Sequence, residues 1–165
     1  KTLGIIGKGS IGMKVGRIAK AFGMNINYFS VRNYKKTQFL KFLSSLDYLS
    51  VHCPLNEKTK DLITIKELKI MKKNMILINT ARGGIVNEND LTKALKQKII
   101  AGAGIDVTTS EPPKKSHAYY SILNEANFIW TPHTAWASNE TLQEAINQLI
   151  KNINSFYKGR KRNIV

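Results

Sequence analysis

Residues 3–15, LGIIGKGSIGMKV, contain a short apolar run, a loop with three glycines and the start of an amphipathic segment. The glycines are Gly7, Gly9 and Gly12, in the pattern G-x-G-x-x-G. The pattern alone is weak, because many turns contain two glycines. Here it directly follows an expected strand and directly opens an expected helix, which is the context that gives it meaning. The stretch therefore predicts a strand–loop–helix unit that starts a parallel sheet.

The rest of the chain alternates short apolar runs with amphipathic stretches. Strands are expected at 3–7, 24–29, 46–53, 75–80, 100–107 and 128–131, and helices at 11–22, about 38–45, 64–72, 87–97 and 139–157. This alternation predicts an α/β fold, a Rossmann-type doubly wound parallel sheet with three layers, α/β/α. We expect residues 1–165 to form one dinucleotide-binding domain that includes the C-terminal helix 139–157, with Ser138 as its N-cap.

Composition indicates a protein without membrane association. No apolar run approaches the roughly 18 residues of a membrane span, and no secretory signal is visible. The single cysteine, Cys53, cannot form an internal disulfide, which fits a reducing compartment and predicts a cytoplasmic location.

The net charge is +15, from 26 Lys and Arg against 11 Asp and Glu. Such a charge can indicate a nucleic-acid partner. The lysines are, however, scattered along the expected helices, and only residues 158–162, KGRKR, form a dense basic run. We therefore expect a solvated surface and no nucleic-acid partner, and a basic nucleic-acid binder is the less favoured alternative.

The glycine loop predicts a dinucleotide site. Gly7 would allow the tight turn, Gly9 would let the backbone approach a pyrophosphate, and Gly12 would let helix and strand pack closely. The helix N-terminus adds amide donors and the positive end of a dipole. The alternative is a glycine-rich turn without a ligand.

The stretch 27–36, NYFSVRNYKK, carries positive charge after the second expected strand. Dinucleotide folds often place an acidic residue here to bind the adenosine ribose. This sequence has Ser30 and, two residues later, Arg32, with Lys35 and Lys36 nearby. A guanidinium and a hydroxyl would bind a 2′-phosphate, so the pattern favours NADP(H). The alternative is a basic surface turn beside a site that binds NAD(H).

Three chemically suited residues follow the ends of other expected strands. They are Arg82, Glu111 and His133, and in an open α/β sheet ligands bind outside the carboxyl ends of the strands. Reduction of a 2-keto acid needs a grip on the carboxylate, a proton and a hydride. Arg82 could bind the carboxylate, His133 could transfer the proton, and Glu111 could orient the imidazole. Each residue taken singly is more often structural than catalytic.

Other candidates are weaker. We expect His52 to be a core histidine, His117 to be solvated in its loop, and Cys53 to pack beside the cofactor. The 3 histidines lack ligand spacing, so the sequence predicts no metal site.

The ordered motifs GKGSIG, HCPLNEKT, INTARGGIVNENDL, AGAGIDVTTSEPP and TPHTAWAS resemble the cofactor-binding domain of the D-isomer-specific 2-hydroxyacid dehydrogenases. The resemblance covers nearly the whole chain and implies the roles given above for Arg82, Glu111 and His133. It further implies a set of cofactor contacts: Ser10 and Ile11 at the pyrophosphate, Cys53 and Pro54 on the adenosine side, and Thr80, Ala81 and Asp106 around the nicotinamide end, with His133 and Ala135 as further cofactor-binding residues.

The resemblance is strongest to the hydroxypyruvate reductase and glycerate dehydrogenase branch, which implies a small 2-keto or 2-hydroxy acid substrate and a homodimer. Family members carry a substrate domain of roughly a hundred residues before the first strand. We expect that domain to be absent from this chain, which would then bind cofactor but turn over slowly or not at all. The alternative function is a non-catalytic dinucleotide-sensing module, like the corepressors of the same superfamily.

Overall fold

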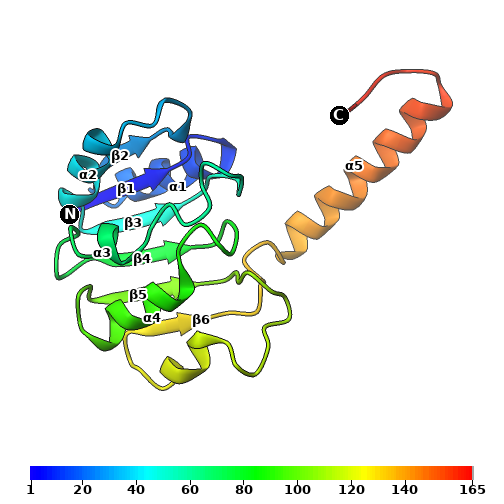
Figure 1. Cartoon of the computed structure of the whole chain (residues 1–165). Helices are drawn as coiled ribbons and strands as arrows, with labels where there is room; N and C mark the ends of the chain where they lie inside the picture. The colour runs from blue at the N-terminus through cyan, green and yellow to red at the C-terminus, as the bar shows by residue number, and fades with distance from the viewer. Residues whose placement is uncertain (165) are drawn as a thin grey trace. The chain divides into compact units, whose positions relative to one another are not determined.

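The protein is described by a computed structural model that covers residues 1–164 and divides into two compact units, Lys1–Pro132 and His133–Val165. The first unit contains six strands and four α-helices (Figure 1). In chain order its elements are β1 (Thr2–Ile6), α1 (Ser10–Ala21), β2 (Asn25–Phe29), η1 (Val31–Asn33), α2 (Lys36–Ser44), β3 (Tyr48–Val51), α3 (Ile65–Leu68), β4 (Ile76–Asn79), α4 (Glu88–Lys96), β5 (Gly102–Ile105), η2 (Ala118–Ile122) and β6 (Phe128–Trp130).

The six strands form one sheet in the order β2-β1-β3-β4-β5-β6. Every neighbouring pair is parallel, and β1 is paired on both sides, with Leu3 opposite Ile26 and Tyr48. The strand order changes direction next to β1, which is where a doubly wound sheet places its ligand crevice. All six predicted strands are confirmed, five of them with narrower bounds and β1 shifted by one residue toward the N-terminus, and so is the predicted parallel α/β fold.

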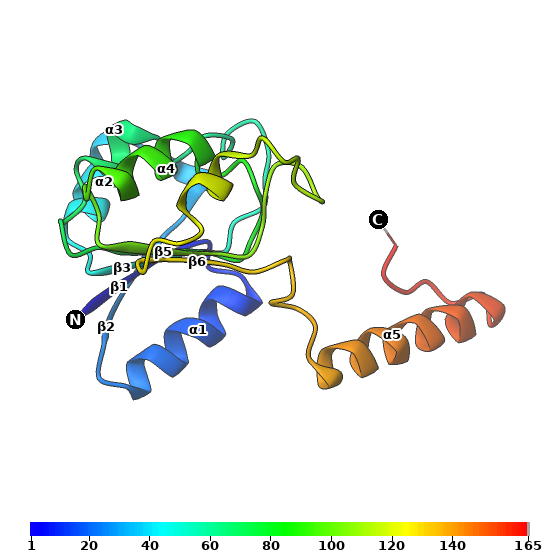
Figure 2. The same cartoon turned by 90° about the horizontal axis from the view of Figure 1, so that it is seen from below.

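Helices cover both faces of this sheet. α1 lies on one face, and α2, α3 and α4 lie on the other (Figure 2). The face with three helices holds the larger apolar core, in which Phe39, Leu49 and Leu77 are fully buried. The smaller core under α1 contains Leu3, Ile5 and Ala19. The predicted three-layer arrangement is therefore confirmed for the first unit.

The α3 segment is shorter than the predicted helix 64–72. Thr64 and Glu67 form a capping box at its start. After Leu68 the hydrogen bonds change to the tighter i to i−3 pattern, from Ile70 N to Glu67 O and from Met71 N to Leu68 O. The two 3₁₀ segments, η1 and η2, were not predicted, because such short turns lack the 3.6-residue period.

The second unit contains α5 (Asn139–Tyr157), at the bounds predicted from the sequence. Ser138 is its N-cap, as predicted, and its Oγ accepts a hydrogen bond of 3.2 Å from Thr141 N. Within residues 1–164, no helix is both long enough and apolar enough to cross a bilayer.

Candidate functional site

The glycine loop between β1 and α1 is fixed by two close backbone approaches. Gly7 has φ +101°, and a Cβ there would lie 2.7 Å from the carbonyl carbon of His52. A Cβ on Gly12 would lie 2.2 Å from the carbonyl oxygen of Gly7. Both positions therefore require glycine, the first for its backbone conformation and both for space.

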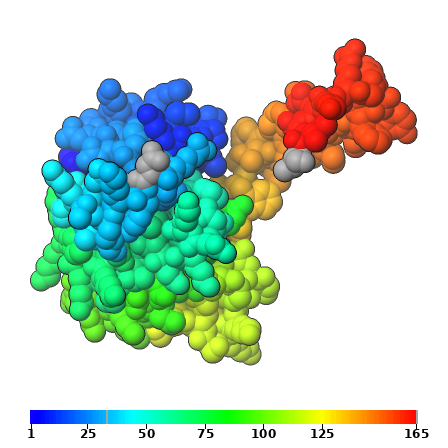
Figure 3. Space-filling model, turned by 45° about the horizontal axis from the view of Figure 1, so that its top comes forward, coloured from blue at the N-terminus to red at the C-terminus, as the bar shows by residue number. Residues whose placement is uncertain are grey.

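Gly9 differs from these two glycines, because nothing lies within 4 Å of the place where its Cβ would be. It is the N-cap of α1, and no side chain among the described residues caps this helix end. Ile11, in the first turn, is 65% exposed, and the blue N-terminal segments reach the surface in the space-filling view (Figure 3). Uncapped amide groups at the positive end of a helix dipole, beside open space, fit a phosphate group.

The segment after β2 lines a pocket of about 490 Å³ with the turn that follows β3. Its lining residues are Val31, Arg32, Asn56, Glu57 and Lys58. Two of them carry positive charge and one carries negative charge. Ser30 caps η1, and its Oγ accepts a hydrogen bond of 3.4 Å from Arg32 N, so backbone and side chain are linked at this turn.

Not every lysine near this turn is available to the pocket. Lys36 forms an ion pair with Glu67, whose side chain is 3% exposed. Burial opposes ionisation of Glu67, but hydrogen bonds from Lys36 and Thr64 outweigh it and lower its pKa. Arg32 and Lys58 are therefore the cations that line the pocket.

The turn after β3 contains Cys53 and Pro54. Cys53 is 2% exposed, and burial raises the pKa of its thiol to about 11. The Oγ1 of Thr59 donates a hydrogen bond of 2.7 Å to Pro54 O, which closes the turn. His52 lies 2.8 Å from Ser50 Oγ through its Nε2, and burial lowers the pKa of its ring.

The turn after β4 presents Thr80, Ala81 and Arg82. Its shape depends on the buried Asn79, which accepts a hydrogen bond of 3.1 Å from Ala81 N and donates one of 3.0 Å to Arg82 O. The guanidinium of Arg82 is exposed and donates to Ala81 O at 2.6 Å. Asn79 was not predicted as a site residue, although a polar residue that ends an apolar strand was a visible signal.

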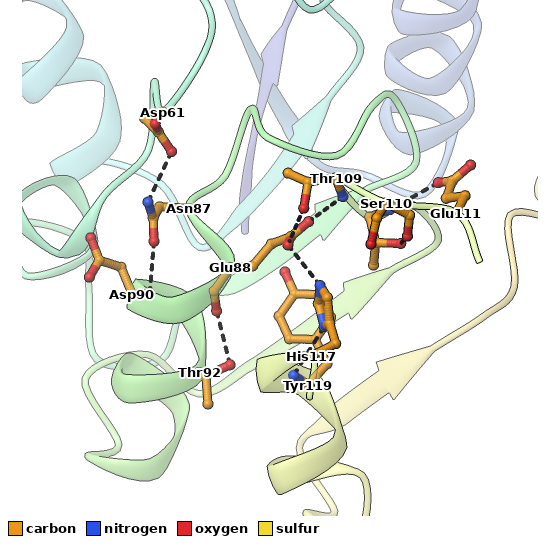
Figure 4. A network of polar contacts seen from close by, with 11 residues as sticks. Asp61, Asn87, Glu88, Asp90, Thr92, Thr109, Ser110, Glu111, His117 and Tyr119 are labelled. Carbon is orange, nitrogen blue, oxygen red and sulfur yellow. Dashed lines mark hydrogen bonds and ion pairs between the residues drawn. The ribbon is translucent and has the colours of Figure 1, made fainter. Parts of the chain in front are cut away.

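The segment after β5 carries Asp106 and Glu111. Asp106 is 3% exposed and accepts a hydrogen bond from Thr131 Oγ1. The Oε1 of Glu111 accepts a hydrogen bond of 3.0 Å from Thr108 N, so the carboxylate is held by its own loop (Figure 4). Since β4 and β5 are neighbours, Arg82 and Glu111 follow adjacent strands at one edge of the sheet.

His133 and Ala135 belong to the second unit. His133 has φ +53°, a left-handed backbone conformation that is uncommon for residues other than glycine. Its carbonyl oxygen accepts a hydrogen bond of 2.7 Å from Trp136 Nε1. Backbone conformations of this kind cluster at functional sites.

The expectation that His117 is solvated is wrong. Its side chain is 8% exposed, and its Nε2 lies 2.7 Å from Glu88 Oε2. The ring stacks on Trp130 and meets Tyr119 edge-on. The sequence around it is rich in proline and lysine, which hid its burial. Among residues 1–164, no group of three or more His, Cys, Asp or Glu is placed to hold a metal ion.

Comparisons with known proteins agree with this architecture. Residues 1–135 match the family model of the D-isomer specific 2-hydroxyacid dehydrogenase, NAD binding domain. A glycerate dehydrogenase from Methylorubrum extorquens is 44% identical over 168 residues, which cover 99% of this chain and 52% of that protein. The chain spans about half the length of the curated relatives it matches.

Two solved structures are also similar. The D-isomer specific 2-hydroxyacid dehydrogenase from Lactobacillus delbrueckii ssp. bulgaricus, in an NAD-complexed form, has a TM-score of 0.88 and 30% identity, covering 98% of this chain and 54% of that one. An NADPH-dependent glyoxylate/hydroxypyruvate reductase from Sinorhizobium meliloti has a TM-score of 0.78 and 25% identity, covering 93% of this chain and 64% of that one. The named relatives give no support to a corepressor-like sensing module. The chain belongs to the D-isomer specific 2-hydroxyacid dehydrogenase family and contains its NAD-binding domain.

Proposed function

We propose that the protein transfers hydride between NAD(P)H and the carbonyl carbon of a small 2-keto acid, such as hydroxypyruvate or glyoxylate. The observation that carries the proposal is the placement of Arg82 and Glu111 after the adjacent strands β4 and β5, in a sheet whose carboxyl edge also holds the open glycine loop. The names of the similar glycerate dehydrogenase and glyoxylate/hydroxypyruvate reductase support the substrate class.

The nucleotide cofactor would supply the hydride, and the protein would bind, orient and protonate the substrate. Arg82, with its exposed guanidinium, would hold the substrate carboxylate through two parallel hydrogen bonds. His133 would donate the proton to the carbonyl oxygen during reduction and remove it during oxidation. Glu111 would orient the imidazole and favour its charged form.

The cofactor would be held along the carboxyl edge of the sheet. The first-turn amides at Ser10 and Ile11 would bind the pyrophosphate. Thr80, Ala81 and Asp106 would contact the nicotinamide end, together with His133 and Ala135. Cys53 and Pro54 would line the adenosine side, where the un-ionised thiol of Cys53 would act as an apolar surface.

We favour NADP(H) over NAD(H) as the cofactor. Ser30 stands where an acidic residue would repel a 2′-phosphate, and the pocket beside it is lined by Arg32 and Lys58. Glu57 lines the same pocket and opposes phosphate binding, so the preference rests on two cations against one anion. The similar proteins include one in an NAD complex and one described as NADPH-dependent.

Fluorescence titration of the chain with NADPH and NADH tests the cofactor proposal. We expect NADPH to bind about tenfold more tightly, the order of one charge-assisted phosphate contact. Arg32→Ala should abolish most of this preference. Arg17→Ala is the matched control, since it removes the same charge from an exposed position on α1. Equal affinity for both cofactors, or a preference that survives Arg32→Ala, would refute the phosphate assignment.

Turnover of the complete protein tests the reaction. With NADPH and hydroxypyruvate or glyoxylate, His133→Asn should lower kcat by about 10²–10⁴-fold. Arg82→Gln should mainly raise KM for the keto acid. Wild-type turnover by His133→Asn would refute its role as the acid.

We also propose a homodimer formed through this domain and a cytoplasmic location. Exposed apolar residues on and after α1, including Ile18 and Phe22, support a protein interface, and the buried single thiol suits a reducing compartment. Sedimentation analysis would detect the dimer, and a monomer at all concentrations would refute it.

A further inference from the structure

We propose that Glu88 is a positioning residue for the reaction, which holds the loop carrying Glu111 in place from the start of α4. The inference rests on the proposed function of Glu111. In this inference Glu88 contributes to the site without contacting substrate or cofactor, and His117 is the partner that orients Glu88.

The first contact is between Glu88 and Thr109. Glu88 Oε1 accepts a hydrogen bond of 2.7 Å from Thr109 N, and Glu88 Oε2 accepts one of 2.8 Å from Thr109 Oγ1. One carboxylate therefore binds both the backbone and the side chain of a residue 21 positions away (Figure 4). Hydrogen bonds to a charged acceptor are about twice as strong as neutral ones.

The second contact fixes the carboxylate itself. Glu88 Oε2 lies 2.7 Å from His117 Nε2, and His117 Nδ1 accepts a hydrogen bond of 3.3 Å from Tyr119 N. Because Nδ1 accepts a hydrogen bond, the ring proton is on Nε2, and Nε2 donates a hydrogen bond to Glu88. Stacking on Trp130 limits rotation of the imidazole. Glu88 is only 11% exposed, so water does not replace these bonds easily.

The third contact links the held loop to the candidate active site. Thr108 precedes Thr109, and its backbone N donates to Glu111 Oε1 at 3.0 Å. On its other side, the loop lies against Gly83, whose Cβ would be 2.0 Å from the carbonyl carbon of Thr108. Gly83 directly follows Arg82. The residues Thr108–Thr109 are thus held between Glu88 and the Arg82 turn, and a shift there would move the donor that orients Glu111.

Glu88→Gln removes the charge and leaves the amide group facing the His117 donor. In hydrogen exchange on the 165-residue chain, we expect the amides of Thr108 and Thr109 to exchange about tenfold faster, with that of Ile105 unchanged. In the complete protein, we expect kcat to fall about tenfold to a hundredfold, with KM for NADPH changed less than about twofold.

The split between kcat and KM separates positioning from stability. A loss of stability alone would lower the melting temperature of Glu88→Gln and leave kcat of the folded protein unchanged. Displacement of Glu111 should instead lower kcat of the folded protein, with KM for NADPH almost unchanged. Glu111→Gln should show the same split.

Asp90→Asn is the matched control. Asp90 lies in the same first turn of α4, and its Oδ2 accepts a hydrogen bond of 3.0 Å from Ile65 N, away from the Thr108–Thr109 segment. It should lower the melting temperature but leave kcat, KM for NADPH and exchange at Thr108 unchanged. Thr109→Val is a second, exposed variant that removes one donor to Glu88. It should produce a smaller change in the same direction as Glu88→Gln, even if that variant folds poorly.

The outcomes distinguish the two proposals. If Glu111→Gln has the wild-type kcat, the proposed role of Glu111 fails and this inference fails with it. If Glu111→Gln is impaired while Glu88→Gln and Thr109→Val behave like Asp90→Asn, only the positioning role is overturned. A shared fall in kcat, with KM for NADPH almost unchanged, in Glu88→Gln, Thr109→Val and Glu111→Gln supports it.

Discussion

Replacing Gly12 by alanine tests whether the glycine loop is built as the structure describes. The new Cβ would lie 2.2 Å from Gly7 O and 3.2 Å from Ile5 Cγ2. A carbon and a carbonyl oxygen normally stay about 3.3 Å apart or more. The helix or the loop must therefore move by about 1 Å. A side-chain rotation cannot relieve the contact, because the obstacle is a backbone atom.

The expected cost follows from two opposing effects. Overpacking costs about 1–3 kcal/mol, and the rigid neighbour places Gly12→Ala at the upper end of that range. Alanine is favoured over glycine within a helix by about 1 kcal/mol. The net loss in the free energy of unfolding should therefore be about 2 kcal/mol. For a chain of this length, that corresponds to a melting temperature lowered by about 4–8 °C.

Gly9→Ala is the matched control, because it adds the same methyl group in the same loop, directly before Ser10 and Ile11. Gly9 has φ −88°, which alanine adopts freely, and nothing lies within 4 Å of the new Cβ. The free energy of unfolding should change by less than about 0.5 kcal/mol. The methyl group would, however, stand where the pyrophosphate approaches the backbone, so NADPH affinity should fall about tenfold.

Thermal denaturation followed by circular dichroism, with NADPH titration of each folded variant, measures both effects. Gly12→Ala melting like the wild type would refute the close packing of helix and strand. Gly9→Ala binding NADPH with wild-type affinity would refute the assignment of this loop to the pyrophosphate. The opposite responses of the two variants are what the loop geometry requires.

Further predictions concern groups with shifted pKa values. Hydrogen bonds from Lys72 and Thr2 N lower the pKa of Asp47 to about 2. The stability that Asp47 contributes is therefore present above 3.8, its pKa in the unfolded chain, and is lost as the pH falls toward 2. Asp47→Asn should lower the resistance to urea at neutral pH, and the difference from the wild type should shrink on acidification. Native Cys53, with a pKa of about 11, should react with iodoacetamide at pH 8 far more slowly than the urea-unfolded chain, and equal rates would contradict its burial. Glu67→Ala removes the capping-box acceptor and should lower the free energy of unfolding by about 1–3 kcal/mol in urea titration; no loss would show that the buried ion pair with Lys36 contributes little.

The sheet could be predicted from the sequence because each strand is a short apolar run between polar turns. β1 and β3 are buried over nearly their whole length, and β4 alternates buried and half-buried residues, so most residues in these strands are apolar. The glycine loop was also predictable, since a tight turn and a close helix contact demand glycine at fixed spacing. Helix α5 was predicted to its last residue, because its cap and its apolar stripe are local signals.

The polar contacts that shape the site could not be predicted in this way. Glu88 and His117 are 29 residues apart, and no local pattern links them. Lys36 looked like part of the basic turn after β2, but its charge is paired with Glu67, 31 residues away. Only the folded chain shows which charges face each other. When the local charge is estimated from the sequence, the estimate therefore includes cations that are already neutralised by a partner.

Close backbone contacts constrain the turns that carry the candidate site. Backbone contacts at Gly7, Gly12 and Gly83 fix the turns that carry the glycine loop and Arg82. Several groups proposed to bind ligand, such as Ser10 and Arg82, are exposed, whereas Cys53 and Asp106 are buried. A site built in this way orders few backbone segments on binding, so little of the cofactor's binding energy would be lost to conformational entropy. Specificity can then change through exposed side chains such as Arg32, while the turns that position the chemistry stay as they are.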